Sequence, residues 1–410
     1  MIERKRYMEK LLKNRDNSMV KILTGMRRVG KSTLLMMLRE ALNAQGIGKS
    51  RIVYLNMESL MNSELLDYKT LYHHIIEKHP DKSKPFYIMI DEIQNVKSWE
   101  RCINSLLVDL NCDIYITGSN SSLFSTELAT LMSGRYITIP VYPLSFSEFK
   151  QFKAIYTGEE FHPYSENEEL FWEYLQSGGL PGLFKIEEDP EFRRQYLMDV
   201  FNSVVLKDVV TRNRIRNTEL LQRLILFLMD NIGKILSAKN IVDFLKSQGR
   251  KHNIETIYSY LTSLEDALIF HKVRRYDIQG KRYLETMEKY YINDLGLKDA
   301  LIGFQDKNIP GMLENIIYME LVKRGYDVSI GKQNRLEVDF VAQKANEKWY
   351  LQISYLIQSQ KTLEREIKSL LSIEDNYRKT ILTLDNLPDS VNKGIERKNL
   401  IRFLLSDSKV

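Results

Sequence analysis

The stretch from Lys21 to Leu38 carries the residues best suited to phosphate chemistry. Gly25 and Gly30 are separated by four residues and are followed by Lys31 and Ser32, which completes a P-loop pattern. The glycines allow a bend whose N–H groups point at phosphate oxygens, the lysine reaches the β- and γ-phosphates, and the serine hydroxyl binds Mg²⁺. The residues expected to bind the nucleotide are Gly25, Arg28, Val29, Gly30, Lys31, Ser32 and Thr33.

Two acidic residues, Asp91 and Glu92, follow the apolar run Phe86–Ile90. The run is apolar on both faces, as expected of a central parallel strand that helices cover on both sides. Two carboxylates at the end of such a strand are costly unless they hold a cation or perform acid–base chemistry. We therefore expect Asp91 to hold the water shell of Mg²⁺ and Glu92 to polarise the attacking water. A strand that simply ends in charge is the alternative.

Two further positions have candidate roles in hydrolysis. The buried strand expected at Cys112–Thr117 is followed by Ser119 and Asn120, and either side chain is placed to contact a γ-phosphate or to orient water. A turn that needs small polar residues explains Ser119 and Asn120 equally well, so a role in hydrolysis and a purely structural role both stay open. Arg135 precedes a strand at 136–141 and is a candidate arginine finger for the nucleotide of a neighbouring subunit. A solvated arginine is the alternative.

These residues need a scaffold that brings strand ends together. Short apolar runs of strand character alternate with helical patterns along the first third of the chain. The expected strands lie at 22–23, 51–56, 86–90, 112–117 and 136–141. Alternation of this kind predicts an α/β fold with a parallel sheet, in which the chemistry-bearing residues gather at the carboxyl ends of the strands.

The composition is that of an ordinary globular protein. The 410 residues correspond to two to four domains at roughly 100–200 residues each. The net charge of +5 is too small to require nucleic acid by itself. Cys102 and Cys112 show neither metal-binding spacing nor a disulfide framework, which favours a reducing compartment. The charged N-terminus lacks the core of a signal peptide, and no apolar run reaches the ~20 residues that span a bilayer. We therefore expect a cytoplasmic protein with no membrane partner.

The order of motifs resembles that of the AAA+ superfamily. Besides the P-loop, the motifs that carry the resemblance are DEIQ (91–94), TGSN (117–120), SGR (133–135) and PLSFSEF (143–149). More narrowly, the chain resembles bacterial and archaeal AAA+ ATPases that carry a C-terminal domain of uncharacterised function, and the resemblance covers nearly the whole chain. It implies ATP and Mg²⁺ as cofactors, Ser119 or Asn120 as sensor 1 and Arg135 as the arginine finger.

The segment SGGLPG at 177–182 departs from that family's pattern. Related ATPases usually carry an arginine shortly after a Gly-Gly segment at this place, and this chain does not. Instead, Gly179-Leu180-Pro181 is similar to the GxP motif of signal-transducing ATPases, in which the proline lies against the adenine. Pro181 is therefore expected to contact the nucleotide, and the departure favours a slow nucleotide-gated switch over a fast ring-driven motor.

A basic module with the element order of a winged helix-turn-helix follows. Helices are expected at 238–247 and 254–267, then a strand-like run at 269–275 and a hairpin at 277–282. The module has nine Lys or Arg residues against five Asp or Glu. The side chains expected to meet DNA phosphates are Arg274, Arg275, Lys281 and Arg282. A lid or protein contact is the alternative, and Glu255 would repel phosphate.

The last part of the chain carries acidic residues in a pattern that resembles the PD-(D/E)XK nuclease core. In that core a helix acid, a strand aspartate and an acid-x-Lys on the next strand hold Mg²⁺ and a water for phosphodiester cleavage. Glu314 and Asp339 match the first two positions, but Gln352-Ile353-Ser354 stands where Glu-x-Lys should be. An amide is a poor cation ligand and serine cannot supply an ammonium, so a nuclease-like domain without cleavage is expected.

The sequence therefore predicts four parts. They are an AAA+ nucleotide-binding domain at 1–150, a helical lid and connector at 151–232, a winged helix at 233–290 and a nuclease-like α/β domain at 291–410. The expected function is a Mg²⁺-dependent ATPase that remodels or translocates a partner, with DNA as the leading candidate through the winged helix and C-terminal domain. A trans-acting Arg135 implies a homo-oligomer, for which a hexameric ring is one arrangement. The alternatives are a nucleotide-gated signalling or defence switch that acts on a protein, and an ATP-regulated nuclease.

Overall fold

A computed structural model of the chain describes residues 2–79, 84–120, 132, 134–159, 164–186, 189–247, 253–284, 287–357 and 359–406. The chain divides into two compact units. The first comprises Met1–Tyr142 and Asp266–Leu268, and the second comprises Pro143–Glu265 and Ile269–Val410. The division into four parts expected from the sequence stays a prediction.

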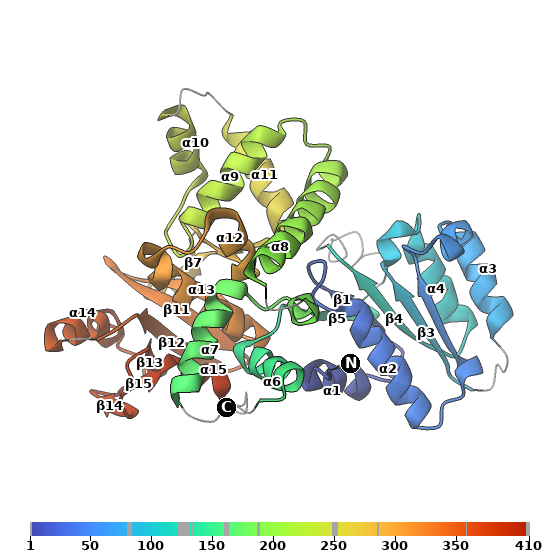
Figure 1. The fold of residues 1–410 in the computed structure, drawn as a ribbon, viewed down its shortest axis with the longest axis horizontal. Coiled ribbons are helices and arrows are strands. Elements are labelled where there is room, and N and C mark those ends of the chain that lie inside the picture. The colour runs from blue at the N-terminus through green and yellow to red at the C-terminus, as the bar shows by residue number, and fades with distance from the viewer. Residues whose placement is uncertain are drawn as a thin grey trace. The chain divides into compact units, whose positions relative to one another are not determined.

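The first unit is built on a five-stranded sheet with the strand order β2-β3-β4-β1-β5 (Figure 1). The strands are β1 (Val20–Thr24), β2 (Ile52–Asn56), β3 (Phe86–Asp91), β4 (Cys112–Gly118) and β5 (Tyr136–Pro140). Every neighbouring pair is parallel. The loops after β1, β3 and β4 therefore leave from one edge of the sheet, which is where ligands bind in folds of this kind. The predicted α/β class with a parallel sheet is confirmed.

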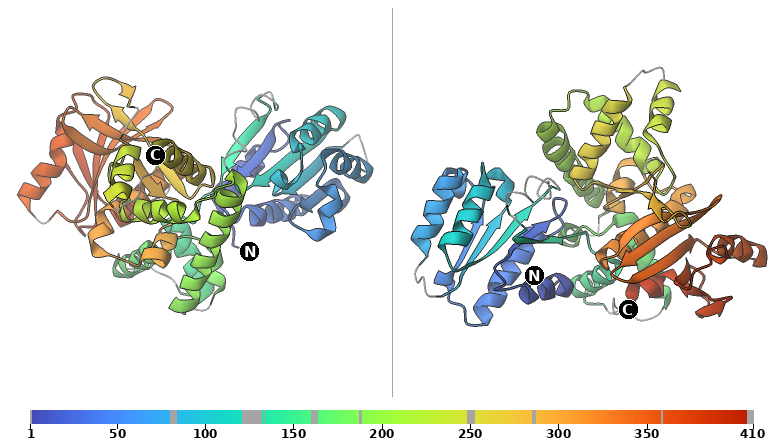
Figure 2. Two further views of the ribbon diagram at one scale, coloured as in Figure 1. Left: turned by 90° about the horizontal axis from the view of Figure 1, so that it is seen from above. Right: turned by 180° about the vertical axis from the view of Figure 1, so that it is seen from behind.

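Helices cover both faces of this sheet (Figures 1 and 2). They are α1 (Lys5–Lys13), α2 (Lys31–Ala44), α3 (Tyr68–Lys78) and α4 (Trp99–Asp109), with 3₁₀ turns η1 (Lys49–Arg51), η2 (Leu60–Leu65) and η3 (Ile93–Asn95). Leu71 of α3 and Ile103 of α4 pack in one core with the strand residues Ile22, Ile88 and Ile114. All six residues of β3 are buried, as its continuous apolar run predicts.

The second unit begins with helices. These are α6 (Phe146–Thr157), α7 (Tyr164–Ser177), η5 (Pro181–Lys185), α8 (Pro190–Val204), the π-helical η6 (Val205–Thr211), α9 (Thr218–Asp230), α10 (Ala238–Ser247) and α11 (Ile254–Asp266). The PLSFSEF motif has a local explanation, because Ser145 and Glu148 form a capping box at the start of α6. Ser145 Oγ accepts the Glu148 N–H at 3.2 Å, and Glu148 Oε2 accepts the Ser145 N–H at 2.9 Å.

The rest of the second unit surrounds an eight-stranded sheet of order β14-β15-β13-β12-β11-β10-β7-β8. Its strands are β7 (Arg275–Asp277), β8 (Arg282–Tyr283), β10 (Asp327–Gln333), β11 (Leu336–Lys344), β12 (Glu347–Ser354), β13 (Arg378–Thr383), β14 (Ser390–Asn392) and β15 (Ile395–Asn399). A separate pair joins β6 (Phe270–Val273) to β9 (Lys289–Ile292). The helices are α12 (Leu295–Ile302), η7 (Asp306–Asn308), α13 (Ile309–Lys323), α14 (Gln360–Leu371) and α15 (Leu400–Leu405).

The hairpin expected to form the wing of a winged helix is part of a larger sheet. β7 pairs with β8 as predicted, but it also runs parallel to β10, with Ile330 beside Arg275 and Lys332 beside Asp277. Edge strands tend to acquire partners because their backbone groups are otherwise unpaired. The hairpin therefore continues the C-terminal sheet. Arg274, Lys281 and Arg282 remain exposed on or beside it, whereas Arg275 is half-buried.

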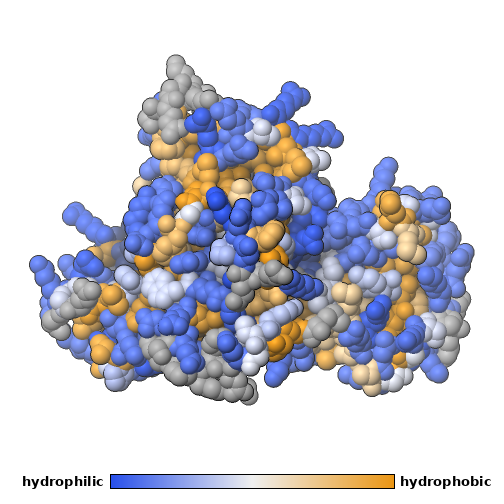
Figure 3. Space-filling model, in the orientation of Figure 1, coloured by the Kyte–Doolittle hydropathy of each residue, from blue (hydrophilic) through white to orange (hydrophobic). Residues whose placement is uncertain are grey.

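The surface is mostly hydrophilic in the view of Figure 3, with one hydrophobic patch over the helices around α9 and others elsewhere on both units. Exposed apolar side chains on α9 to α11 are Leu226, Phe244, Ile254 and Tyr258. In the part of the chain that the structure describes, none of the helices has the length and apolar character needed to cross a membrane.

Candidate nucleotide-binding site

The P-loop pattern forms the turn between β1 and α2. Gly25 directly follows β1, and a Cβ there would lie 2.2 Å from the carbonyl oxygen of Val141, so only glycine fits. Gly30 has φ 98° and stands at the N-cap of α2. Arg28, which is exposed, also has a left-handed backbone at φ 69°. The tight turn thus has the backbone geometry that the two glycines predict.

The start of α2 is open to an anion. Its N-cap, Gly30, has no side chain to accept the first N–H groups, and its first turn holds no acidic residue. Ser32 and Thr33, in that first turn, are half-buried. The N–H groups of a helix start and the positive end of the helix dipole together favour a phosphate at this place.

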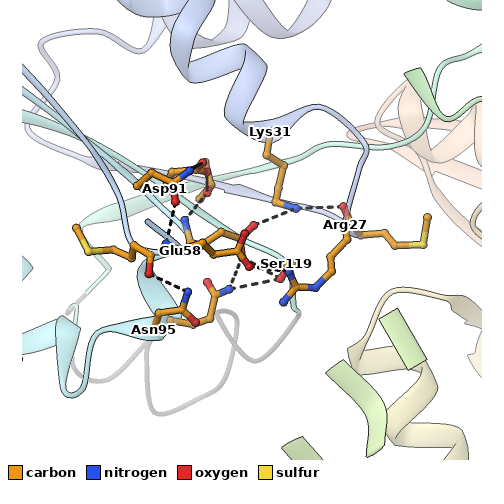
Figure 4. A network of polar contacts seen from close by, with 12 residues as sticks. Arg27, Lys31, Glu58, Asp91, Asn95 and Ser119 are labelled. Carbon is orange, nitrogen blue, oxygen red and sulfur yellow. Dashed lines mark hydrogen bonds and ion pairs between the residues drawn. The ribbon is translucent and has the colours of Figure 1, made fainter. Parts of the chain in front are cut away.

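Lys31 is buried and points back toward its own loop. Its Nζ donates to the carbonyl oxygen of Gly25 at 2.8 Å and to that of Met26 at 3.1 Å. The same nitrogen lies 3.9 Å from Glu92 Oε1, and both side chains are less than one-tenth exposed. The ammonium is therefore shared between neutral carbonyls and one carboxylate (Figure 4).

Asp91 ends β3 as a buried carboxylate surrounded by neutral donors. Its Oδ1 accepts the hydroxyl of Thr117, and its Oδ2 is 3.3 Å from both Tyr54 Oη and Asn56 Nδ2. Burial and the Asp91 charge raise the pKa of Tyr54 to about 12, so this phenol stays a donor at neutral pH. None of these three partners is a cation, so the negative charge of Asp91 is not cancelled by them.

Glu92 has a left-handed backbone at φ 54°, which turns the chain sharply after the strand. Its N–H donates to Thr117 Oγ1 at 2.9 Å, and Ser119 Oγ donates to its Oε2 at 3.0 Å. Gln94 also donates to Oε2. A strained non-glycine residue held by several neighbours is typical of functional sites. Glu92 is thus fixed between the P-loop lysine and Ser119, which follows β4.

The structure brings together most of the predicted residues of the first unit. The P-loop, Asp91, Glu92 and Ser119 form one network, and Asn120 is buried beside Ser119. Arg135 lies at the opposite edge, where Val20 N–H donates to its carbonyl oxygen just before β1 begins. The Arg135 side chain is exposed and reaches Asn104 Oδ1 at 3.4 Å. Pro181 belongs to the second unit, and Ser133 of the SGR motif lies outside the described residues.

Four residues of the network were missed in the sequence. Thr117 contacts both acidic residues, Tyr54 and Asn56 contact Asp91, and Gln94 contacts Glu92. A signal existed for Thr117 and Asn56, because each is a polar residue close to the end of a buried strand, as Asp91 is. Arg4 was also missed: its guanidinium donates to the Val29 and Tyr142 carbonyl oxygens at 3.1 and 2.9 Å and supports the loop from α1.

Comparisons with known proteins bear on this site. A family model described as an AAA domain matches residues 17–150, and one described as a domain of unknown function (DUF8612) matches residues 168–308. An uncharacterized protein of Haemophilus influenzae is 39% identical over 405 residues, 99% of each chain. The chain belongs to the same family as this protein. A second relative in that family, an uncharacterized protein of Methanocaldococcus jannaschii, is 30% identical over 90% of this chain and 80% of its own.

A solved structure has a similar fold. The Walker-type ATPase PABY2304 of Pyrococcus abyssi matches with a TM-score of 0.50 at 17% identity, over 73% of this chain and 96% of that chain. Family and fold together confirm the predicted AAA-type ATPase domain and support nucleotide binding by its P-loop. Neither the nuclease-like character of the C-terminal part nor a winged helix follows from these likenesses.

Proposed function

We propose that the protein is a Mg²⁺-dependent ATPase. The observation that carries this proposal is the network at one edge of the sheet. It consists of Lys31, Asp91, Glu92 and Ser119, beside the glycine loop. Phosphate oxygens can replace the loop carbonyls that accept hydrogen bonds from Lys31. The partners of Asp91 are neutral donors, and the start of α2 has no side-chain cap, so a cation and a phosphate can use these two groups. The site therefore fits a triphosphate together with a hard cation.

The roles of the chain's own residues follow from their contacts. Lys31 leaves the carbonyls of its loop and pairs with phosphate oxygens, and Ser32 and Asp91 are the residues that would hold Mg²⁺. The ion would neutralise charge on the phosphates. Glu92, already hydrogen-bonded by Ser119, accepts the proton of the attacking water. Ser119 is our choice for sensor 1, because it contacts Glu92 directly, while Asn120 remains the alternative.

The test is the steady-state ATPase rate of the full chain beside Glu92→Gln and Lys31→Ala. We expect Glu92→Gln to bind ATP without hydrolysing it and Lys31→Ala to do neither. A Glu92→Gln variant that retains normal turnover would remove Glu92 from the mechanism. Pro181→Ala tests the adenine contact implied by the Gly179-Leu180-Pro181 segment. We expect this variant to lose affinity for ATP but not for inorganic triphosphate, which lacks the adenine.

Arg135 is proposed to act on a neighbouring subunit. β1 and β5 run parallel with Val20 beside Tyr136 and Thr24 beside Pro140, so Arg135 and the P-loop stand at opposite ends of adjacent strands. Five residues at ~3.3 Å each separate them by roughly 15 Å, beyond the reach of an arginine side chain. Arg135 can therefore complete a nucleotide site only in a second copy, which supports a homo-oligomer such as a ring.

Mixing two inactive variants tests this arrangement. Arg135→Ala keeps an intact P-loop, and Lys31→Ala keeps an intact Arg135, so mixed oligomers contain some complete sites. We expect the mixture to regain ATPase activity that neither variant has alone. The control replaces Lys31→Ala by the double variant Lys31→Ala/Arg135→Ala, which cannot complement. Full activity of Arg135→Ala alone would refute the arginine-finger role.

DNA is the proposed partner, and the basic hairpin supports it. Arg274, Lys281 and Arg282 are exposed on or beside β7 and β8. Binding through phosphates must weaken steeply with salt, because counterions are released. We therefore expect duplex or branched DNA to bind at low salt, to release at high salt and to stimulate hydrolysis. The triple variant Arg274→Gln/Lys281→Gln/Arg282→Gln should reduce both binding and the salt slope.

A protein partner is the second candidate, favoured by the surface of α9 to α11. Phe244 is 39% exposed and Tyr258 is 50% exposed, and such side chains suit protein contacts better than phosphates. In that case the protein is a nucleotide-gated switch with a low ATPase rate that DNA does not change. An unchanged rate with every DNA form, together with salt-independent weak binding, would favour the switch over the DNA remodeller.

A further inference from the structure

A second lysine–carboxylate cluster lies in the second unit and shares no residue with the ATPase site. Lys289 of β9 places its Nζ 2.9 Å from Glu314 Oε2 of α13 and 2.8 Å from Glu337 Oε1 of β11. Tyr291 donates its hydroxyl to the same Glu314 oxygen at 2.8 Å. Asp339, two residues after Glu337, is buried and its Oδ2 accepts the Ile353 N–H at 2.7 Å.

Two of these acids are the ones that the nuclease resemblance assigns to Mg²⁺. The order α13-β10-β11-β12-α14-β13 carries Glu314 on the helix and Asp339 on the second strand, as that resemblance requires. The third position does not fit. The Gln352 amide lies 3.5 Å from Glu366 Oε2 and accepts the Ser369 hydroxyl at 3.4 Å, so its contacts are to α14. Over the described residues, no group of acids, histidines or cysteines is arranged to hold a metal ion.

The charges show why a cation is nevertheless needed. Burial and the neighbouring carboxylates raise the pKa of Asp339 well above its usual value, and burial raises the pKa of Glu314. Burial alone would lower the pKa of Lys289, but the charges of Glu314, Asp339 and Glu337 outweigh it and raise that pKa. The Lys289 Nζ lies within 2.9 Å of two carboxylate oxygens, which favour its charged form. Its side chain is 3% exposed, so its charge is compensated by these carboxylates rather than by water.

We propose that the Lys289 ammonium is the resident cation of this cluster and occupies the place that a divalent metal takes in a nuclease. The lysine comes from β9, outside the helix–strand core that carries the acids, and it binds the Glu314 carboxylate that a metal would need. An ammonium holds carboxylates together but cannot activate a water or polarise a phosphate as a metal ion does. The cluster ties β9, α13 and β11 together and leaves the domain without cleavage.

This inference is independent of ATP hydrolysis in the first unit, and it makes a gain-of-function prediction. Removing the ammonium should leave these acids without a cation, so that they can rearrange around a hard divalent ion. The variant is Lys289→Met, whose unbranched side chain is one atom shorter and carries no charge. The probe is Mn²⁺, titrated calorimetrically into nucleotide-free full-length protein. All variants carry Asp91→Asn, so that the ATPase site adds no divalent binding.

We expect no Mn²⁺ binding with Lys289 present and one bound Mn²⁺ per chain in Lys289→Met, accompanied by a rise in the melting temperature. The double variant Lys289→Met/Asp339→Asn removes the ammonium together with one acid of the cluster and should neither bind Mn²⁺ nor depend on it for stability. Lys298→Met, which removes another buried lysine, is the matched control and should not gain the ion.

Two results would overturn the proposal. One is Mn²⁺ binding by the protein with Lys289 that disappears on Asp339→Asn, because the cluster would then hold a metal despite the lysine. The other is a Lys289→Met variant that folds normally and gains no ion. If Lys289→Met does not fold alone, the proposal requires that refolding in Mn²⁺ or the added Asp339→Asn restores it, and failure of both would refute it.

Discussion

Each of the two units contains a buried lysine among carboxylates, yet the two lysines are held differently. Lys31 has two backbone carbonyls as hydrogen-bond partners and lies 3.9 Å from its carboxylate. Lys289 has two carboxylates within 2.9 Å. The first lysine follows a glycine loop at the start of α2, whereas the second is in a strand whose four residues are all buried.

The difference separates a ligand site from an internal ion cluster. Neutral carbonyls are weak partners that a phosphate can replace at small cost, so Lys31 is available for a ligand. Paired carboxylates are strong partners in a poorly solvated place, and breaking them leaves a buried charge uncompensated. Residue types alone do not distinguish the two sites. The partners of the lysine and the backbone that surrounds it do.

The largest effect is expected from Glu92→Gln. Loss of the general base should lower kcat by roughly 10²–10⁴-fold while ATP binding is retained, because Lys31 and the loop are untouched. Nucleotide affinity and turnover measured on the same preparation check this. Glu58→Gln is a matched control, since Glu58 pairs with Arg27 at the rim (2.9 Å) and is half exposed. If the two variants behave alike, the first site is also merely an ion cluster, and the comparison fails.

Glu314→Ala is the corresponding change in the second unit. It leaves Lys289 with one partly exposed partner and Tyr291 without its acceptor, so the free energy of unfolding should fall by about 3–5 kcal/mol. Glu337→Ala should cost less, because the Glu337 side chain is 32% exposed and water can take its place. Chemical denaturation checks both values. ATP affinity should not change in either variant, and equal costs would contradict the assignment of Glu314 as the main partner.

Asp294 sharpens the comparison, because it is a buried carboxylate whose hydrogen-bond partners are backbone groups. It accepts the N–H groups of Gly179 at 2.7 Å and Gly296 at 3.0 Å, beside a small cavity that Lys323 also lines. Burial raises the pKa of Asp294 to about 6, although Gly179 N–H and Lys323 favour its charged form.

The folded state therefore binds this proton more tightly than the unfolded chain, whose ordinary value is 3.8. The stabilisation is complete below about pH 4 and is lost as the pH rises through about 6, by an amount on the order of 2–3 kcal/mol. Asp294→Asn should flatten this part of the stability profile, whereas exposed Asp306→Asn should leave it unchanged. Urea midpoints between pH 4 and 7 measure the slope. An unchanged slope in Asp294→Asn would assign the effect to other groups.

Much of the first unit was predictable from local pattern. The glycine spacing, the apolar run Phe86–Ile90 and the acids that follow it each depend on neighbours in the sequence, and the structure has them as expected. The parallel sheet follows from the alternation of strands and helices. Contacts between strands that are far apart in the sequence were harder to predict. The pairing of β7 with β10 joins segments that are far apart in the chain, and no local signal specifies it.

Lys289 shows the same limit at the level of a site. The sequence has Glu314 and Asp339 but lacks a lysine at the expected strand position, so loss of cleavage was the natural interpretation. The structure supplies the ammonium from β9, a strand that pairs with β6 and lies outside the helix–strand order of the domain. Spacing rules describe one segment at a time, whereas a buried charge can be compensated by any segment that packs nearby.

Thr117→Val is expected to have the smallest effect of these changes. The sequence alone assigned no role to Thr117. Its hydroxyl donates to Asp91 and accepts the N–H of Glu92 at 2.9 Å, so one side chain orients both acids. Thr117→Val preserves shape but removes both contacts, and we expect roughly a tenfold loss in kcat, equal to about 1.4 kcal/mol. Thr117→Ser keeps the hydroxyl and should retain most of the activity. The same Val-for-Thr change at Thr380, buried in β13, should alter stability without altering kcat. If Thr117→Val affects only stability, the hydroxyl supports the sheet rather than the reaction, and the first site loses one of the features that set it apart from the cluster around Lys289.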